Sequence, residues 1–222
     1  MLHAPQIKNA LPHLSTVKSC AMVGCGTGYV DLPFVRECFP NLTELAAVEP
    51  DADQMAEFKT NVSQQIPSVS VDFYQETAQS WKGSSGKLFD AVLLFHSLYF
   101  VSPSERPVLF QKLLDHVLVS GGVVLIFIDP SRVSKLSLVP YQDIGGDQLS
   151  DVVTSVGFED CYQLEIECQM DVQGPNDDLA ALIVFLNEGK LSLEEARCEV
   201  EEKLSGLKFI PCKNWFGAFR KP

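Results

Sequence analysis

Hydrophobic residues along the chain form short continuous runs, separated by longer stretches in which they recur every three or four positions. The continuous runs are typical of parallel strands covered on both faces, and the periodic stretches predict helices. The runs stop at glycine or polar residues, as strands of such a sheet do where they reach a loop. Five strands are predicted in the first 128 residues, over 19–23, 42–48, 69–74, 89–95 and 123–128.

Helices are predicted between these strands and after the last of them. Asp51 can cap the second helix, which should end before Pro67. Gly121 and Gly122 are expected to end a longer helix that starts at Ser104. The predicted helices cover 30–39, 52–66, 104–119, 147–156, 179–186 and 193–204. A loop is expected over 131–146 and a further strand over 161–168. The apolar pieces 209–211 and 215–219 are expected to form a closing strand.

The alternation of strands and helices predicts the α/β class, with a doubly wound and mostly parallel sheet. A chain of 222 residues that is 46% hydrophobic can bury a substantial core in one domain. We therefore interpret residues 1–222 as a single domain. Residues 1–18 are expected to be a short lead-in, and 172–206 a helical insertion before the last strand.

Composition excludes several classes of partner. The formal net charge of −12 argues against nucleic acid, because neutralising phosphates requires a basic face. The apolar runs are too short to span a bilayer, and the first residues lack the apolar block of a signal peptide. Seven cysteines without a Cys-x-x-Cys pair fit free thiols better than disulfides or a metal site. The sequence therefore predicts a cytoplasmic protein without a metal that acts on a small molecule, expected as a monomer.

A glycine-rich turn, with Gly24, Gly26 and Gly28, joins the strand over 19–23 to the helix that follows. Glycines allow the backbone to approach a ligand closely, and the free N–H groups of the helix face whatever the turn holds. A dinucleotide site would carry Gly-x-Gly-x-x-Gly, and here Tyr29 takes the place of the last glycine. The spacing resembles the cofactor loop of S-adenosylmethionine-dependent methyltransferases; a glycine turn in another α/β protein is the alternative.

Glu49 ends the second predicted strand, roughly 20 residues after the glycine turn, where an acid grips the ribose of an adenosine cofactor. Its carboxylate could accept hydrogen bonds from both ribose hydroxyls; the alternative is a solvated loop acid. The segments 75–78 and 96–100 also follow predicted strands. Ligands in such sheets lie beyond the carboxyl ends of the strands, so these segments are expected to meet at one site.

Two segments resemble the histamine N-methyltransferase family: Glu49-Pro50-Asp51-Ala52-Asp53-Gln54, and Leu98-Tyr99-Phe100-Val101. The region from Cys161-Tyr162 to Met170-Asp171-Val172 is similar too. The resemblance runs from about residue 22 to about residue 186. It implies a Rossmann-like class I methyltransferase sheet with a reversed last strand, and S-adenosylmethionine as the cofactor. The cofactor-binding residues that it implies are Gly24, Glu49, Gln54, Thr77, Ala78 and Phe95, to which the glycine spacing adds Gly26 and Gly28; Tyr99 and Phe100 match the aromatic pair of its amine pocket.

The chain departs from this family in three places. His96 stands where the family has glutamine, and the glycine turn contains fewer glycines. The family also carries a long N-terminal segment that covers the pocket and supplies an acid for the amine, whereas here the turn already begins at Gly24. A chain without that segment is expected to have an open pocket, another substrate or no turnover.

His96 is the candidate catalytic residue, because a histidine at the end of a buried strand could accept a proton from a substrate nitrogen or orient it. A hydrogen-bonded structural histidine is the alternative. Tyr99 and Phe100 would stack on a flat substrate, although they could equally be core residues. We predict an N-methyltransferase that acts on a small, histamine-like imidazole or amine. A methyltransferase for another small molecule and a non-catalytic binding module of the same fold are the alternatives.

Overall fold

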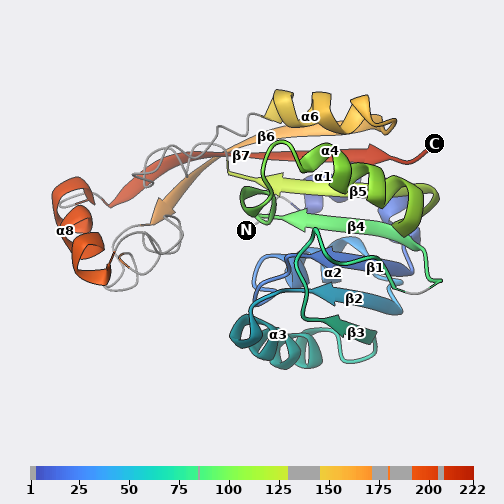
Figure 1. Cartoon of the computed structure of the whole chain (residues 1–222), viewed down its shortest axis with the longest axis horizontal. Coiled ribbons are helices and arrows are strands. Elements are labelled where there is room, and N and C mark those ends of the chain that lie inside the picture. Colours follow the sequence, from blue (N-terminus) through green and yellow to red (C-terminus); the bar gives the residue numbers. More distant parts are fainter. Residues whose placement is uncertain (1–3, 85, 130–145, 172–179, 181–191, 205–207) are drawn as a thin grey trace. The chain divides into compact units, whose positions relative to one another are not determined.

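A computed structural model of the chain (Figure 1) describes residues 4–84, 86–129, 146–171, 180, 192–204 and 208–222. Contacts divide the chain into two compact units. One contains Met1–Ile128, Gly146–Leu164 and Phe216–Pro222, and the other contains Asp129–Gly145 and Glu165–Trp215. Every candidate site residue named above belongs to the first unit.

The strands form one seven-stranded sheet in the order β3-β2-β1-β4-β5-β7-β6. Neighbouring strands from β3 to β5 pair in parallel. The last strand runs the other way, as its arrow in Figure 1 shows. The predicted fold class is therefore confirmed, including the reversed last strand. The strands are β1 (Ser19–Val23), β2 (Glu44–Val48), β3 (Ser70–Tyr74), β4 (Phe89–Phe95), β5 (Leu118–Ile128), β6 (Glu159–Asp171) and β7 (Phe209–Arg220).

Helices follow the strands as the hydrophobic pattern predicts. Asp51 caps α3, since its carboxylate accepts a hydrogen bond of 2.9 Å from the Gln54 N–H. The described α-helices are α1 (Ala4–Ala10), α2 (Asp31–Cys38), α3 (Ala52–Gln65), α4 (Arg106–Lys112), α6 (Gly146–Ser155) and α8 (Leu193–Leu204). Short 3₁₀ segments cover Pro12–Thr16 and Leu98–Phe100. The loop expected over 131–146 lies, except for Gly146, outside the described residues, and so does most of the helix expected over 179–186.

The core lies where α2 and α3 pack on the sheet. In α2, the Phe34 ring lies 5.0 Å from the Phe95 ring of β4 and 6.3 Å from the Phe216 ring of β7. In α3, the Phe58 ring lies 6.4 Å from Phe73 of β3. These contacts fix both helices, and therefore the loops that precede them, at the carboxyl ends of β1 and β2. No helix among the described residues has the length and apolarity needed to cross a membrane.

The prediction that Gly121 and Gly122 end a helix is wrong. The helix α4 stops at Lys112, a π-helical turn covers Leu113–Val117, and β5 begins at Leu118, before both glycines. The two glycines form an irregularity inside β5, where its register against β4 shifts. They pair with the last strand, since the Gly121 N–H donates to the Lys221 carbonyl and the Lys221 N–H donates to the Gly122 carbonyl. The φ of +77° at Gly121 explains why a glycine stands there.

Candidate functional site

The candidate site lies where the strand order of the sheet reverses, between β1 and β4. In an open α/β sheet, ligands bind at the carboxyl ends of the two strands that flank this point. Gly24 follows β1 and Ser97 follows β4, and the two segments are in close contact. A Cβ atom placed on Gly24 would lie 2.4 Å from the Ser97 Cβ, so only glycine fits there.

The glycine turn has the backbone conformation that its composition predicts. The φ angles of Gly24, Gly26 and Gly28 are +73°, +52° and +76°. The turn is also tied to its neighbours, because the Gly24 N–H donates to the Val48 carbonyl at 2.8 Å and the Asn61 side chain donates to the Thr27 carbonyl at 2.9 Å. Gly28 faces the core, where an added Cβ would lie 2.8 Å from the Phe58 ring.

Glu49 is connected directly to the glycine turn. One carboxylate oxygen accepts a hydrogen bond of 2.9 Å from the Gly26 N–H, and the other accepts one of 3.1 Å from the Asp51 N–H. The residue is only 7% exposed. Gln54 lies on the same side, since its Oε1 is 3.0 Å from where a Cβ of Gly26 would be. The structure therefore brings together four predicted cofactor residues: Gly24, Gly26, Glu49 and Gln54.

The turn after β3 holds Thr77 and Ala78, and it is closed by its own side chains. The Thr77 hydroxyl accepts a hydrogen bond of 3.1 Å from the Ser80 N–H. The half-buried ammonium of Lys112 in α4 then donates to three carbonyls of this turn, those of Ala78 at 2.6 Å, Gln79 at 3.3 Å and Trp81 at 2.7 Å. Burial lowers the pKa of Lys112 from its usual value.

We expect Lys112→Met to lower the free energy of unfolding by about 1–3 kcal/mol, because it removes the donor for three carbonyls. Methionine keeps a similar apolar length, so the change tests the ammonium alone. Thermal unfolding followed by circular dichroism measures the loss. Lys82→Met is the matched control, since Lys82 is exposed in the next segment of the chain; equal effects of the two changes would contradict this role of Lys112.

His96 directly follows β4 and has a strained backbone. Its φ of +53° is the only positive value at a non-glycine position among the described residues. Such a conformation costs of the order of 1–3 kcal/mol and is concentrated at functional sites. The His96 N–H donates to the Phe127 carbonyl at 2.8 Å, and the Nδ1 atom lies 3.2 Å from the Tyr99 hydroxyl. The two rings are stacked, with centroids 6.0 Å apart.

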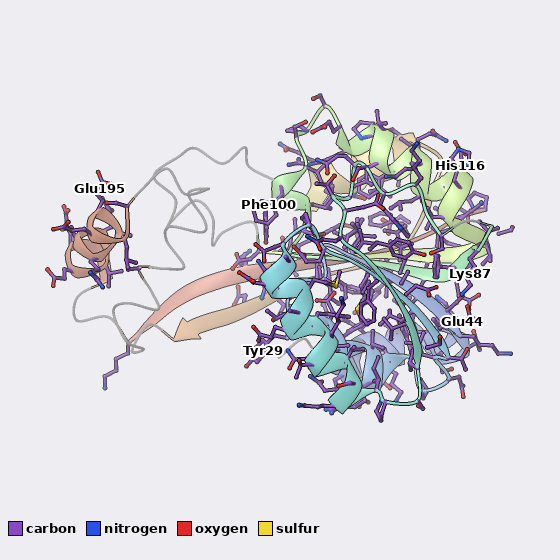
Figure 2. All side chains as sticks on the ribbon, turned by 60° about the horizontal axis from the view of Figure 1, so that its bottom comes forward. Tyr29, Glu44, Lys87, Phe100, His116 and Glu195 are labelled. Atoms are coloured by element: carbon purple, nitrogen blue, oxygen red, sulfur yellow. The ribbon has the colours of Figure 1, made fainter. Side chains whose placement is uncertain are left out.

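The predicted aromatic residues Phe95 and Phe100 differ in their surroundings. Phe95 is 3% exposed and belongs to a core cluster, with its ring 5.8 Å from that of Phe127. Phe100 is 49% exposed and lies at the surface of the unit, where Figure 2 labels it. The Gln79 side chain donates to the Phe100 carbonyl at 3.4 Å, which links the turn after β3 to the segment after β4. A contact of Phe95 with adenine, and of Tyr99 and Phe100 with substrate, stays a prediction.

Three residues at the site were missed by the sequence interpretation. Lys112 and Ser97 carry no local signal, because their roles depend on contacts with segments distant in the sequence. Asp31 had a usable signal: it is an acid at the start of an otherwise apolar helix stretch, and the structure buries it to 5% exposure. Desolvation and the nearby charge of Glu49 raise its pKa to about 8, although its own backbone N–H donates to the carboxylate.

The described residues fit an adenosine cofactor with a charged amino-acid part. The Ser97 hydroxyl is buried without a hydrogen-bond partner in the part of the chain that is described, beside the first glycine of the turn. Such a group is an available donor or acceptor for a ligand. The carboxylate of Glu49 adds an acid that can bind the ribose.

Comparison with known proteins gives a match to one family. The model of a family described as "Methyltransferase domain" matches residues 21–122, which run from β1 through the site to the middle of β5. A comparison with curated protein sequences finds no match.

Several solved structures have a similar fold at low sequence identity. The N-methyltransferase NodS from Bradyrhizobium japonicum WM9 is 12% identical, over 98% of this chain and 96% of that chain, with a TM-score of 0.59. Another structure of NodS contains S-adenosyl-L-homocysteine. The [4+2]-cyclase SpnF is 17% identical over 99% of this chain and 80% of that chain, with a TM-score of 0.62. The StiE O-MT domain is 14% identical over 98% and 73%, with a TM-score of 0.57.

Residues 21–122 therefore resemble a methyltransferase domain, and the sheet has the strand order of the class I type. Methyltransferases of this class take the methyl group from S-adenosylmethionine, so the predicted cofactor is confirmed at the level of the class. These comparisons support the methyltransferase class. They do not identify the histamine N-methyltransferase family, and they do not identify nitrogen as the atom that is methylated.

Proposed function

We propose that this protein is an S-adenosylmethionine-dependent N-methyltransferase that acts on a small imidazole or amine. The observation that carries the proposal is the hydrogen bond between the Glu49 carboxylate and the Gly26 N–H at the point where the strand order reverses. It joins the two predicted cofactor elements into one site. The resemblance to histamine N-methyltransferases supports a nitrogen acceptor.

In this proposal Glu49 and Gln54 bind the ribose end of the cofactor, and the glycine turn allows its backbone to approach the amino-acid part. The lone pairs of Glu49 that the two N–H groups leave free accept from the ribose hydroxyls. Thr77 and Ala78 lie at the adenine edge, on the turn that Lys112 fixes. When bound, the cofactor supplies an electrophilic methyl group on a sulfonium.

The protein then needs to hold a neutral nitrogen in line with that methyl group and to exclude water. His96 and Tyr99 are suited to this work. With its Nδ1 atom beside the Tyr99 hydroxyl, the His96 ring is fixed in orientation, and its Nε2 atom is the one that would meet the acceptor. An imidazole there can accept the proton that the acceptor nitrogen loses. The exposed ring of Phe100 supplies an aromatic surface for a flat substrate.

The test has two parts. Calorimetric titration of the wild type with S-adenosylmethionine and with S-adenosylhomocysteine should give micromolar affinity, and NAD should not compete. Transfer of a labelled methyl group is then measured on a panel of acceptors that begins with histamine and includes other imidazoles, primary amines and phenols. Binding with transfer to nitrogen supports the proposal; the absence of cofactor binding would refute it.

His96→Ala should leave the affinity for S-adenosylhomocysteine within about twofold and slow methyl transfer about tenfold. General acid–base groups usually contribute about 100-fold or more to a rate. We expect a smaller decrease here, because a neutral nitrogen attacks the methyl group before it loses its proton. Initial rates at saturating cofactor measure the change. His116→Ala is the matched control, because His116 is an exposed residue of the π-helical turn, and Figure 2 shows it apart from Phe100. An unchanged rate for His96→Ala would remove this residue from the mechanism.

The proposal also covers the oligomeric state, the location and the domain organisation of the protein. We propose that the chain works as a monomer in the cytoplasm, with 1–222 as one methyltransferase domain, 1–18 as lead-in and 172–206 as an insertion. The odd number of cysteines and the negative net charge support the cytoplasm and a small-molecule partner. The SpnF cyclase shows that this fold also hosts another reaction. Cofactor binding without transfer to any acceptor would favour a non-catalytic binding module.

A further inference from the structure

We propose that Asp31 is a second cofactor-binding carboxylate, which holds the ammonium group of the amino-acid part of S-adenosylmethionine. The assignment rests on the function proposed above. Asp31 is the first residue of α2, three positions after the last glycine of the turn. It therefore directly follows the glycine turn, which in the proposed function faces the amino-acid part of the cofactor, whereas Glu49 receives the ribose.

The Asp31 carboxylate is buried, and it forms no ion pair with a cationic side chain in the described part of the chain. It is 5% exposed, and its own backbone N–H is the one donor that it has among the described residues. A carboxylate oxygen pair has about four acceptor positions, and most of these are unused here. A buried acid in this state is costly to keep unless a ligand completes it. The position is also close to the glycine turn, because the N–H of the next residue, Leu32, donates to the Gly28 carbonyl at 3.0 Å.

An ammonium group fits this carboxylate better than the other cations at such a site. Its three N–H groups form short, charge-assisted hydrogen bonds with a carboxylate. The sulfonium of the same cofactor has no donor at all. A metal ion would need further ligands, and no group of three His, Cys, Asp or Glu side chains that could hold one is found among the described residues.

Binding of this ammonium should release a proton. Burial and Glu49 raise the pKa of Asp31 to about 8, so this carboxyl is mostly protonated in the free protein at pH 7. The titratable groups that interact with it are Glu49 at the end of β2, Cys20 in β1 and Cys25 in the turn. An ammonium against the carboxylate lowers its pKa, and the proton leaves to the buffer. The release is largest below pH 8 and disappears as the pH rises above 8, because the free protein is then already ionised.

The experiment measures proton release by calorimetry at pH 7 in buffers of different ionisation enthalpy. Three ligands are compared: S-adenosylmethionine, S-adenosylhomocysteine and 5′-methylthioadenosine, which lacks the amino-acid part. We expect most of one proton to be released per site with the first two ligands and almost none with the third. Binding of S-adenosylhomocysteine to Asp31→Asn should release almost no proton. At pH 8, near the pKa of the wild-type carboxyl, this variant should bind S-adenosylhomocysteine about tenfold more weakly than the wild type does. Affinity for 5′-methylthioadenosine should stay within about twofold.

The Asn side chain has nearly the shape of the protonated acid, so Asp31→Asn should fold. Asp53→Asn, an exposed acid in the first turn of α3, is the matched control and should leave proton release unchanged. Equal proton release by Asp31→Asn and wild type would overturn the assignment. So would release with S-adenosylmethionine alone, because the cation would then be the sulfonium. Failure of the wild type to bind S-adenosylhomocysteine would instead overturn the proposed function, and this assignment with it.

Discussion

Gly24→Ala should lower the free energy of unfolding by about 2–5 kcal/mol and abolish measurable cofactor binding. A left-handed conformation costs an alanine about 1–2 kcal/mol, and an overpacked contact adds about 1–3 kcal/mol. The overpacking is specific here, since the new Cβ would lie 2.4 Å from the Ser97 Cβ, which cannot rotate away. This contact would push apart the ends of β1 and β4. The segment after β4 would then lie farther from the glycine turn, and the cofactor site would be disrupted. Chemical denaturation and titration with S-adenosylhomocysteine measure the two effects.

Gly86→Ala is the matched control for this change. Gly86 has a φ of +78°, almost the same as the +73° of Gly24, but an added Cβ there would meet nothing within 4 Å. It should therefore show only the conformational cost, about 1–2 kcal/mol, and full cofactor affinity. The difference between the two variants gives the cost of the contact with Ser97. Equal losses of stability would show that Gly24 is required for its backbone conformation alone.

Glu49→Ala should weaken binding of S-adenosylmethionine by at least about 100-fold, or about 2.7 kcal/mol. Two effects contribute. The ribose loses its acceptor, and the Gly26 N–H loses the partner that holds the turn in place. Glu57→Ala, at an exposed position of α3, is the control for charge and should leave the affinity unchanged. A change of less than about threefold in Glu49→Ala would rule out the ribose role.

Glu49→Gln separates the two contributions. Glutamine keeps one acceptor oxygen, but its amide NH₂ must face either the Gly26 N–H or the Asp51 N–H, and two donors cannot bond to each other. We expect an affinity between those of the wild type and Glu49→Ala, together with a lower melting temperature than the wild type. Calorimetry and thermal unfolding of the three proteins measure the order.

The sheet could be predicted from the sequence because its signals are local. The buried runs of β4 and β5 and the cap at Asp51 depend on neighbouring residues alone, and the spacing of the glycine turn from Glu49 reflects the length of one strand–helix–strand unit. The same reasoning failed at Gly121, where a glycine pair after a helix normally means a helix end. The structure uses the pair to shape β5 against the last strand, a partner about 100 residues away.

The glycine turn and the acid after β2 could be predicted from the sequence, whereas the contacts that hold the site in place could not. Gly24 and Glu49 belong to a motif, so their positions follow from spacing. Lys112 is indistinguishable in sequence from a surface lysine, and its three carbonyl partners appear only when α4 packs beside the turn after β3. The strained backbone of His96 likewise has no sequence signal, since histidine at the end of a strand is compatible with an ordinary conformation.

The place of β7 in the sheet has a consequence for how the protein folds during synthesis. This strand is made last, yet it lies between β5 and β6 rather than at an edge. The five parallel strands can assemble as they leave the ribosome, whereas β6 has no neighbour until Phe209–Arg220 has emerged. Until then β5 presents an unpaired apolar edge of the kind that recruits other chains. The nascent protein should therefore depend on chaperones until this final insertion is complete.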